Sequence, residues 1–202
     1  MTRIIAGAAG GSTLLSVPGT GTRPTSDRVK EALFSRLDAY NAVHGARVLD
    51  LFAGSGSLGV ESASRGAATV DLVEAAEKPA AVCRQNAGLV NTVLGSTAVR
   101  VHRSTVESYL LRVPPGTQWD LVLMDPPYPL EENQLGVILA AVAPHLGAGA
   151  VLVLERSVRS SEPQWPAGLA RFAEKKYGET RLWFAEPAVG ATEAALQGAL
   201  AD

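Results

Sequence analysis

The dominant pattern in the chain is a series of short apolar runs, rich in leucine and β-branched residues, that begins at residue 47. Short runs of this kind are typical of strands that are buried on both faces of a sheet. We therefore predict strands at residues 47–52, 69–74, 97–102, 119–124 and 150–155.

The segments between these runs carry apolar residues at helical spacing and predict helices near residues 57–66, 77–91, 105–112 and 132–146. Alternating strands and helices favour a parallel sheet with helices on both faces. Two further runs, at 170–177 and 180–185, flank a turn at Gly178 and predict a terminal hairpin. That hairpin makes one strand antiparallel, so we expect an α/β fold with a seven-stranded, mostly parallel sheet.

The N-terminal part of the chain has a different pattern. Apolar runs at 3–6 and 13–17 are joined by a pair of glycines, which predicts a small β-hairpin. A loop at 22–27 then offers Thr, Ser and Asp side chains as caps for a following helix. We divide the chain into an N-terminal β-hairpin extension (1–21), one larger α/β domain (22–187) and a loosely ordered tail (188–202).

The composition is that of an ordinary globular protein. The chain has 202 residues, of which 47% are apolar, and no apolar run approaches the ~20 residues of a membrane span. Cys83 is the single cysteine, so an internal disulfide and a cysteine-based zinc site are excluded. This cysteine usage favours a reducing cytoplasm, and we expect no contact with a membrane.

A glycine-rich turn follows the first predicted strand. Residues 48–59 read Val-Leu-Asp-Leu-Phe-Ala-Gly-Ser-Gly-Ser-Leu-Gly, and glycine permits the positive φ and close backbone approach of a ligand-binding turn. The glycine spacing matches the dinucleotide fingerprint, and Glu74 lies at the end of the next predicted strand. On this evidence a nicotinamide or flavin cofactor fits the turn as well as S-adenosylmethionine does.

Two features favour S-adenosylmethionine. Asp50 precedes the turn and places a carboxylate at the strand tip, where it suits a cationic amino group and is poorly placed beside a pyrophosphate. The chain that follows Glu74 completes one sheet but leaves little for the substrate domain of a dehydrogenase. Glu74 itself does not discriminate, because both cofactors carry ribose hydroxyls.

A second candidate site follows the fourth predicted strand and consists of Asp125, Pro126, Pro127 and Tyr128. Two prolines remove two backbone N–H donors and fix two φ angles, so a central strand cannot continue here. The corner offers hydrogen-bond acceptors, including the Asp125 carboxylate, beside a flat ring. This chemistry suits a planar amine such as that of a nucleobase, with Tyr128 placed to stack on the base.

The glycine turn followed by this tetrapeptide resembles class I amino-methyltransferases. More specific is the leader at 23–34, Arg-Pro-Thr-Ser-Asp-Arg-Val-Lys-Glu-Ala-Leu-Phe, preceded by Arg-Ile-Ile-Ala-Gly at 3–7. With these segments the chain, from residue 3 to residue 187, resembles the RsmD-type methyltransferases, which modify a guanine N2 amine in bacterial 16S ribosomal RNA. The resemblance implies a Rossmann-like class I methyltransferase fold and S-adenosylmethionine as the methyl donor.

The resemblance also implies roles for individual residues. Those expected to hold the methionine part of the cofactor are Thr25, Asp50, Phe52, Ala53, Gly54, Ser55 and Gly56. Those expected at its ribose and adenine are Glu74, Ala75, Thr105 and Val106. Residues 125–128 would be catalytic, because the Asp125 carboxylate and the Pro126 carbonyl would orient the target amine.

We expect the N-terminal hairpin and leader to contact RNA through a group of basic residues, Arg3, Arg23, Arg28 and Lys30. Residues 1–47 carry six basic and three acidic side chains, whereas the other 155 residues carry 12 and 17. The net charge of the whole chain is only −2, so the basic character is local. The expected partner is 16S rRNA in the small ribosomal subunit.

Two other functions stay open. The same tetrapeptide would serve an enzyme of this fold that acts on adenine N6 in DNA or RNA. Alternatively, a non-catalytic module would bind the cofactor and dock on RNA without methyl transfer. His44, His102 and His145 have no ligand spacing, so we expect no metal site. We expect the protein to be a monomer.

Overall fold

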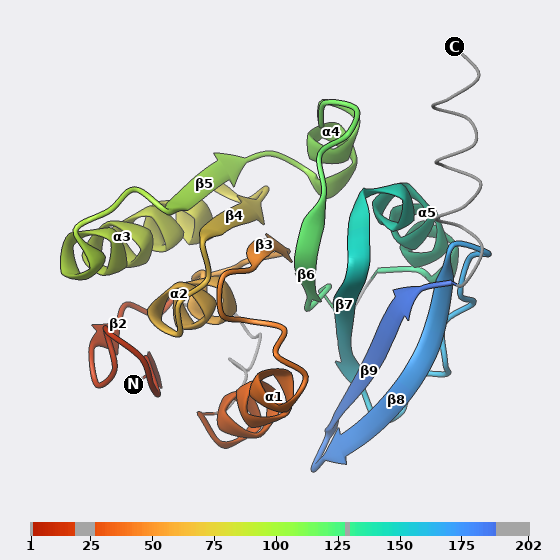
Figure 1. The fold of residues 1–202 in the computed structure, drawn as a ribbon, viewed down its shortest axis with the longest axis horizontal. Helices are drawn as coiled ribbons and strands as arrows, with labels where there is room; N and C mark the ends of the chain where they lie inside the picture. Colours follow the sequence, from red (N-terminus) through yellow and green to blue (C-terminus); the bar gives the residue numbers. More distant parts are fainter. Residues whose placement is uncertain (1, 19–26, 128–129, 189–202) are drawn as a thin grey trace.

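The computed structural model describes residues 2–18, 27–127 and 130–188. Its centre is a seven-stranded sheet with the strand order β5-β4-β3-β6-β7-β9-β8 (Figure 1). In chain order these strands are β3 (Arg47–Leu51), β4 (Thr69–Glu74), β5 (Val99–Arg103), β6 (Trp119–Met124), β7 (Leu146–Ser157), β8 (Leu169–Tyr177) and β9 (Thr180–Pro187). All seven predicted strands are present, and the start of β7 differs most from its prediction.

Helices cover both faces of the sheet. They are α1 (Asp27–Ala39), α2 (Ser57–Ser64), α3 (Glu77–Leu94), α4 (Val106–Leu110) and α5 (Glu132–Val142). The first three pack on one face, and α4 and α5 pack on the other (Figure 1). Among the described residues, none of the helices combines the length and apolar character that spanning a membrane requires.

The order of the strands reverses between β3 and β6. From β3 the chain proceeds outward to β4 and β5, and it then returns to place β6 on the other side of β3. β3 pairs in parallel with both β4 and β6, so all three strands end at the same edge of the sheet. Ligands of open α/β sheets bind at the carboxyl ends of the strands at such a reversal.

The predicted terminal hairpin is confirmed. β9 lies between β7 and β8 and runs antiparallel to both. Trp183 of β9 lies opposite Leu154 of β7, and both side chains are fully buried in the core on the α5 face. The hairpin thereby closes one side of the hydrophobic core.

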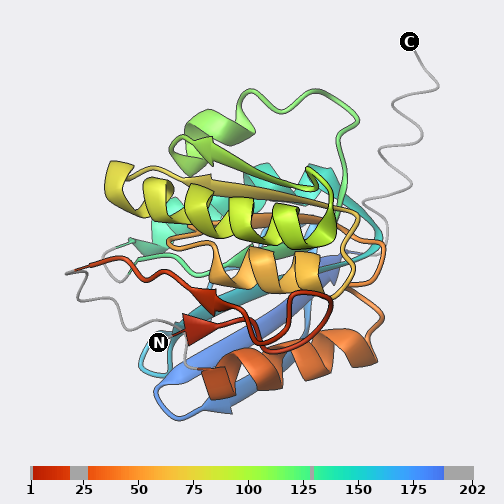
Figure 2. The same ribbon diagram turned by 90° about the vertical axis from the view of Figure 1, so that its left-hand side faces the viewer.

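Residues 2–17, here called the N-terminal segment, form a much smaller hairpin than predicted. β1 (Thr2–Arg3) and β2 (Thr13–Leu14) pair with each other in two antiparallel positions. The segment lies across α2, between α1 and α3 (Figure 2). It therefore packs on the same face of the protein as these three helices.

Ser64, at the end of α2, holds the middle of the N-terminal segment. Its carbonyl accepts the Ala8 N–H at 2.8 Å, and its Oγ accepts the Ala9 N–H at 2.9 Å and donates to the Ala6 carbonyl at 2.6 Å. Gly7 allows this close approach, because a Cβ at this position would lie 1.9 Å from the Ser64 carbonyl oxygen.

A buried ion pair lies beneath the start of the same segment. The side chains of Lys30 on α1 and Glu61 on α2 are both fully buried, with Lys30 Nζ 3.7 Å from Glu61 Oε2. Lys30 Nζ donates to the Arg3 carbonyl, and Glu61 accepts the N–H groups of Ile5 and Ala6 at 2.7 and 3.1 Å. Burial lowers the pKa of Lys30, and Glu61 opposes this shift. The prediction that Lys30 contacts RNA is wrong, because its ammonium group has no exposed surface.

We expect Gly7→Ala to reduce the free energy of unfolding by about 2–4 kcal/mol, from left-handed strain and from overpacking against Ser64. Gly11→Ala is a matched control, because Gly11 has the same φ of +84° and its added Cβ would meet nothing within 4 Å. The control should lose about 1 kcal/mol. Urea unfolding measures both, and equal losses would contradict the tight contact.

Candidate active site

The candidate active site lies where β3, β4 and β6 end. Leu51 of β3 is opposite Met124 of β6, so the residues that follow them, Phe52 and Asp125, lie beside each other. Glu74 ends β4 on the other side of β3. The parallel pairing therefore brings the two motifs of the sequence, the glycine turn and the Asp-Pro-Pro corner, to one place.

The turn between β3 and α2 has a left-handed backbone at three positions. The φ angle is 65° at Phe52, 57° at Gly54 and 80° at Gly56. The positive φ predicted for the glycines is confirmed at both 54 and 56. Phe52 is not a glycine, and left-handed strain at such a residue is found most often at functional sites.

Gly56 of the turn and Gly59 in the first part of α2 are also required for packing. A Cβ on Gly56 would lie 2.8 Å from the Sγ of Cys83, and a Cβ on Gly59 would lie 2.1 Å from a methyl group of Leu72. Cys83 is fully buried, and burial raises the pKa of its thiol. Cys83 therefore acts as a small apolar side chain of the core, and the turn is held close against α3 and β4.

Glu74 fixes the position of the turn. Its Oε2 accepts the Gly54 N–H at 2.9 Å, and its Oε1 accepts the Ala76 N–H at 2.7 Å. The side chain is half-buried. One carboxylate therefore binds both the glycine turn and the start of the segment that leads into α3.

Asp50 is buried below the turn, with only 2% of the residue exposed. Its Oδ2 accepts the Gly59 N–H at 2.9 Å. Burial raises the pKa of Asp50 to about 8, the Gly59 N–H opposes this rise, and the negative charges of Asp125 and Glu74 add to it. The isolated site therefore favours the neutral acid, and a bound cation would restore the carboxylate.

The electrostatics of the site discriminate between ligands. Asp50, Glu74 and Asp125 lie close enough for their charges to interact, and no cation among the described residues contributes to the shift in the pKa of Asp50. A pyrophosphate would add negative charge to this group of carboxylates, whereas a ligand with a cationic amine and a sulfonium would relieve their repulsion. The site therefore favours a cationic ligand over a dinucleotide.

Asp125 and the two prolines form the predicted corner at the end of β6. The Leu130 N–H donates to the Pro127 carbonyl at 3.0 Å. The protein around Asp125 raises the pKa of its carboxyl to about 6, because burial disfavours the charged form. Solvent also reaches this residue and limits the rise, so the carboxylate is the dominant form at neutral pH. Tyr128 lies outside the described residues.

Arg156 supports the segment that follows this corner, and sequence reasoning missed it. Its guanidinium donates to Glu132 Oε1 at 2.7 Å and lies 3.4 Å from the Leu130 carbonyl. Only 10% of its side chain is exposed. No local signal could have found this residue, because an arginine at the end of a strand usually lies in solvent.

The residues predicted at the adenine lie near the carboxyl ends of β4 and β5. Ala75 and Thr105 are exposed, and Thr105 Oγ1 accepts the Ser108 N–H at 3.2 Å, which caps α4. Val106 is 4% exposed and packs in the core on the α5 face. Little of its side chain is available to a ligand, so a contact from Val106 would come from its backbone.

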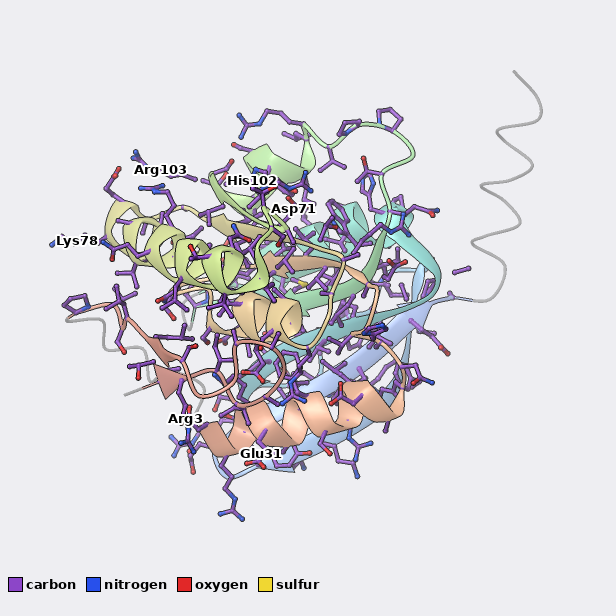
Figure 3. The ribbon with its side chains drawn as sticks, turned by 60° about the vertical axis from the view of Figure 1, so that its left-hand side comes forward. Arg3, Glu31, Asp71, Lys78, His102 and Arg103 are labelled. Atoms are coloured by element: carbon purple, nitrogen blue, oxygen red, sulfur yellow. The ribbon has the colours of Figure 1, made fainter. Side chains whose placement is uncertain are left out.

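The residues predicted to contact RNA differ in their surroundings. Arg3 points outward beside α1, which carries Glu31 (Figure 3), and 65% of the Arg3 side chain is exposed. Arg28 is exposed at the start of α1. Arg23, like Thr25 of the predicted cofactor site, lies outside the described residues. Arg3 and Arg28 therefore remain candidates for contact with RNA.

Two of the histidines have structural partners. His102 lies 2.7 Å from the Asp71 carboxylate on the neighbouring strand (Figure 3), and His145 Nδ1 lies 2.9 Å from the Thr117 carbonyl. Within residues 2–18, 27–127 and 130–188, no three His, Cys, Asp or Glu side chains are grouped as metal ligands would be.

Comparisons with known proteins find relatives that match most of this chain. A profile of the family described as Conserved hypothetical protein 95 matches residues 2–186. The ribosomal RNA small subunit methyltransferase D of Escherichia coli K12 is 34% identical over 177 residues, which is 88% of this chain and 85% of that protein. The protein of the same name from Haemophilus influenzae is 38% identical over 126 residues, 62% of this chain and 63% of its own.

Solved structures show the same architecture. A hypothetical protein of Thermus thermophilus, TTHA0928, superimposes with a TM-score of 0.77 at 30% identity, over 92% of this chain and 99% of the other. Magnesium protoporphyrin IX methyltransferase from Synechocystis PCC 6803, solved with bound SAM, has a TM-score of 0.61 at 18% identity, over 80% and 79% of the two chains. The second likeness concerns the fold alone.

We expect Asp50→Asn to stabilise the protein at neutral and alkaline pH. The folded pKa of about 8 lies above the ordinary value, so the stability that protonated Asp50 contributes is complete below about pH 4 and is lost as pH rises to about 8. Asparagine does not ionise and can still accept the Gly59 N–H. The Tm advantage of the variant should therefore grow from pH 5 to pH 8, by about 2–4 °C for each kcal/mol gained.

Asp120→Asn provides a control of opposite sign. Arg47 holds the pKa of Asp120 below its usual range, so this carboxylate stabilises the fold at neutral pH and loses its effect as pH falls. The control should lower Tm at pH 7. The Tm difference between Asp120→Asn and wild type should be the same at pH 6 as at pH 8. A Tm for Asp50→Asn that equals wild type at every pH would contradict the buried, protonated Asp50.

Proposed function

Because this chain belongs to the RsmD-type family of ribosomal RNA methyltransferases, we propose that it methylates the N2 amine of a guanine in 16S rRNA. The methyl donor of the proposal is S-adenosylmethionine, and the substrate is the small ribosomal subunit in the cytoplasm. The observation that carries the proposal is the grouping of Asp50, Glu74 and Asp125 around a left-handed glycine turn.

The proposed cofactor site uses residues on both sides of β3. The Asp50 carboxylate would bind the cationic amino group, and the backbone of residues 52–56 would bind the rest of the methionine part. Glu74 would accept hydrogen bonds from the ribose hydroxyls, while it keeps its bond to the Gly54 N–H. A carboxylate has about four acceptor positions on its two oxygens, so Glu74 can serve both. When bound, the cofactor supplies a methyl group that its positive sulfur already activates.

Asp125 would orient the target amine. A guanine amine is a poor nucleophile, because its lone pair is conjugated with the ring. Hydrogen bonds from the two amine hydrogens to the Asp125 carboxylate and the Pro126 carbonyl would favour a pyramidal nitrogen and direct its lone pair towards the methyl group. The nitrogen gains the methyl group and afterwards releases one proton, which Asp125 or water accepts. We therefore assign Asp125 to orientation first and to proton acceptance second.

The base would have to leave its stack to reach this corner, at a cost of a few kcal/mol. Tyr128 follows the corner in sequence, and we propose that it stacks on the flipped base. Arg3 and Arg28 would contact the surrounding RNA phosphates, since both are exposed on the side of the N-terminal segment and α1. The segment and the catalytic domain would act together as a monomer.

The decisive experiment identifies the modified nucleoside. The protein is incubated with labelled S-adenosylmethionine and small subunits that lack the modification, and the RNA is then digested. We expect label in N2-methylguanosine. Label in N6-methyladenosine would contradict the guanine assignment, and a protein that binds the cofactor without transferring label would be the non-catalytic module.

We expect Asp125→Ala to reduce kcat by at least about 10²–10³-fold, because the acceptor that orients the amine is lost. Cofactor affinity should stay within a few-fold of wild type, as measured by calorimetry. Asp120→Ala is a matched control on the same strand, since Asp120 pairs with Arg47 at the opposite end of β6. The control should lower Tm and keep kcat. Near-normal turnover by Asp125→Ala would refute the catalytic role of the corner.

A further inference from the structure

Asn86 of α3 is a buried polar residue that the proposed chemistry does not use. Only 1% of the residue is exposed, and its amide makes three hydrogen bonds. Oδ1 accepts the Leu15 N–H at 2.9 Å, and Nδ2 donates to the Leu15 carbonyl at 3.0 Å and to the Ser55 carbonyl at 2.9 Å. Both amide donors are therefore engaged, one by the N-terminal segment and one by the glycine turn.

These bonds join two parts of the chain that carry different proposed tasks. Leu15 lies at the end of the N-terminal segment, whose Arg3 is a candidate RNA contact. Ser55 lies in the turn that would hold the methionine part of the cofactor. A primary amide is planar, so a rotation that follows a shift of Leu15 also turns the donor away from the Ser55 carbonyl.

The turn has a second link to the N-terminal segment. Gly56 is the N-cap of α2, and Ser64 at the other end of the same helix binds the backbone of Ala8 and Ala9. The segment is therefore fixed at both ends of α2, by Ser64 at one end and through Asn86 at the other. A shift of the segment reaches the turn most directly through Asn86, because this one side chain bonds to both Leu15 and Ser55.

We propose that Asn86 is a positioning residue that couples RNA binding by the N-terminal segment to the affinity of the glycine turn for the cofactor. The inference rests on the proposed function, because it takes the turn as the cofactor site and the segment as an RNA contact. RNA that orders the segment fixes Asn86, and Asn86 then holds the Ser55 peptide in place. Thermodynamic linkage makes the effect reciprocal, so the cofactor tightens RNA binding by the same factor.

Asn91 provides a matched control on the same helix. Its Oδ1 accepts the Val99 N–H at 3.0 Å, and its Nδ2 donates to the Val99 carbonyl at 2.9 Å. Asn86 makes the same pair of hydrogen bonds with the backbone of Leu15. The pair made by Asn91 binds β5 instead, and Asn91 makes no bond to the turn. A purely structural role predicts equal consequences for Asn86→Ala and Asn91→Ala.

The test measures the Kd of labelled S-adenosylhomocysteine, which cannot donate a methyl group, by equilibrium dialysis with and without saturating unmodified small subunits. In the wild type we expect the subunits to lower this Kd about fivefold or more, the lower end of typical coupling. Asn91→Ala should keep the wild-type ratio of the Kd without subunits to the Kd with subunits. In Asn86→Ala the ratio should fall to within twofold of one, and the KM for S-adenosylmethionine should rise with less change in kcat.

Asn86→Asp is the second variant, for the case that Asn86→Ala does not fold. Aspartate can still accept the Leu15 N–H but cannot donate to the carbonyls of Leu15 and Ser55, so it should also lose the coupling. A wild-type ratio in either folded Asn86 variant, or a ratio of one in the wild type, would overturn the inference. A wild type that binds no S-adenosylhomocysteine would instead refute the proposed function.

Discussion

The Asp50 carboxyl lies buried beneath the glycine turn, where it accepts the Gly59 N–H and lies in the fields of Asp125 and Glu74. Such burial is costly for a charged group, and it is maintained by a sheet whose core surrounds the strand tips. The same arrangement makes the site attractive to a cation and unfavourable for a pyrophosphate. The fold loses stability because it buries Asp50. In return, the carboxyl group is already in place to bind a cationic ligand.

The N-terminal segment belongs physically to this arrangement. It contacts α2 through Ser64, it covers the ion pair of Lys30 and Glu61, and it reaches the glycine turn through Asn86. A segment whose only role was to bind RNA would not need these buried polar bonds. Each bond connects the N-terminal segment with the helices and the turn that surround the candidate active site.

The features that could be predicted from the sequence are those that neighbouring residues encode. The strand and helix pattern, the positive φ at Gly54 and Gly56, and the corner at Pro126 and Pro127 depend on local sterics and on periodicity. The burial of Lys30 could not be predicted in this way, because lysine is usually exposed and its partner Glu61 lies on another helix. Nor could the contact of Asn86 with Leu15 and Ser55, since nothing local distinguishes this asparagine from Asn91.

The sequence by itself determined the order of strands and helices, the glycine turn, the target corner and the resemblance to one methyltransferase family. Those are properties of short segments, and the resemblance compares such segments in order. Only the tertiary structure decided which charges meet. It grouped Asp50, Glu74 and Asp125 at the reversal between β3 and β6, withdrew Lys30 from the surface and joined Leu15 to Ser55 through Asn86. The physical reason is that burial and long-range hydrogen bonding depend on packing between segments far apart in the chain.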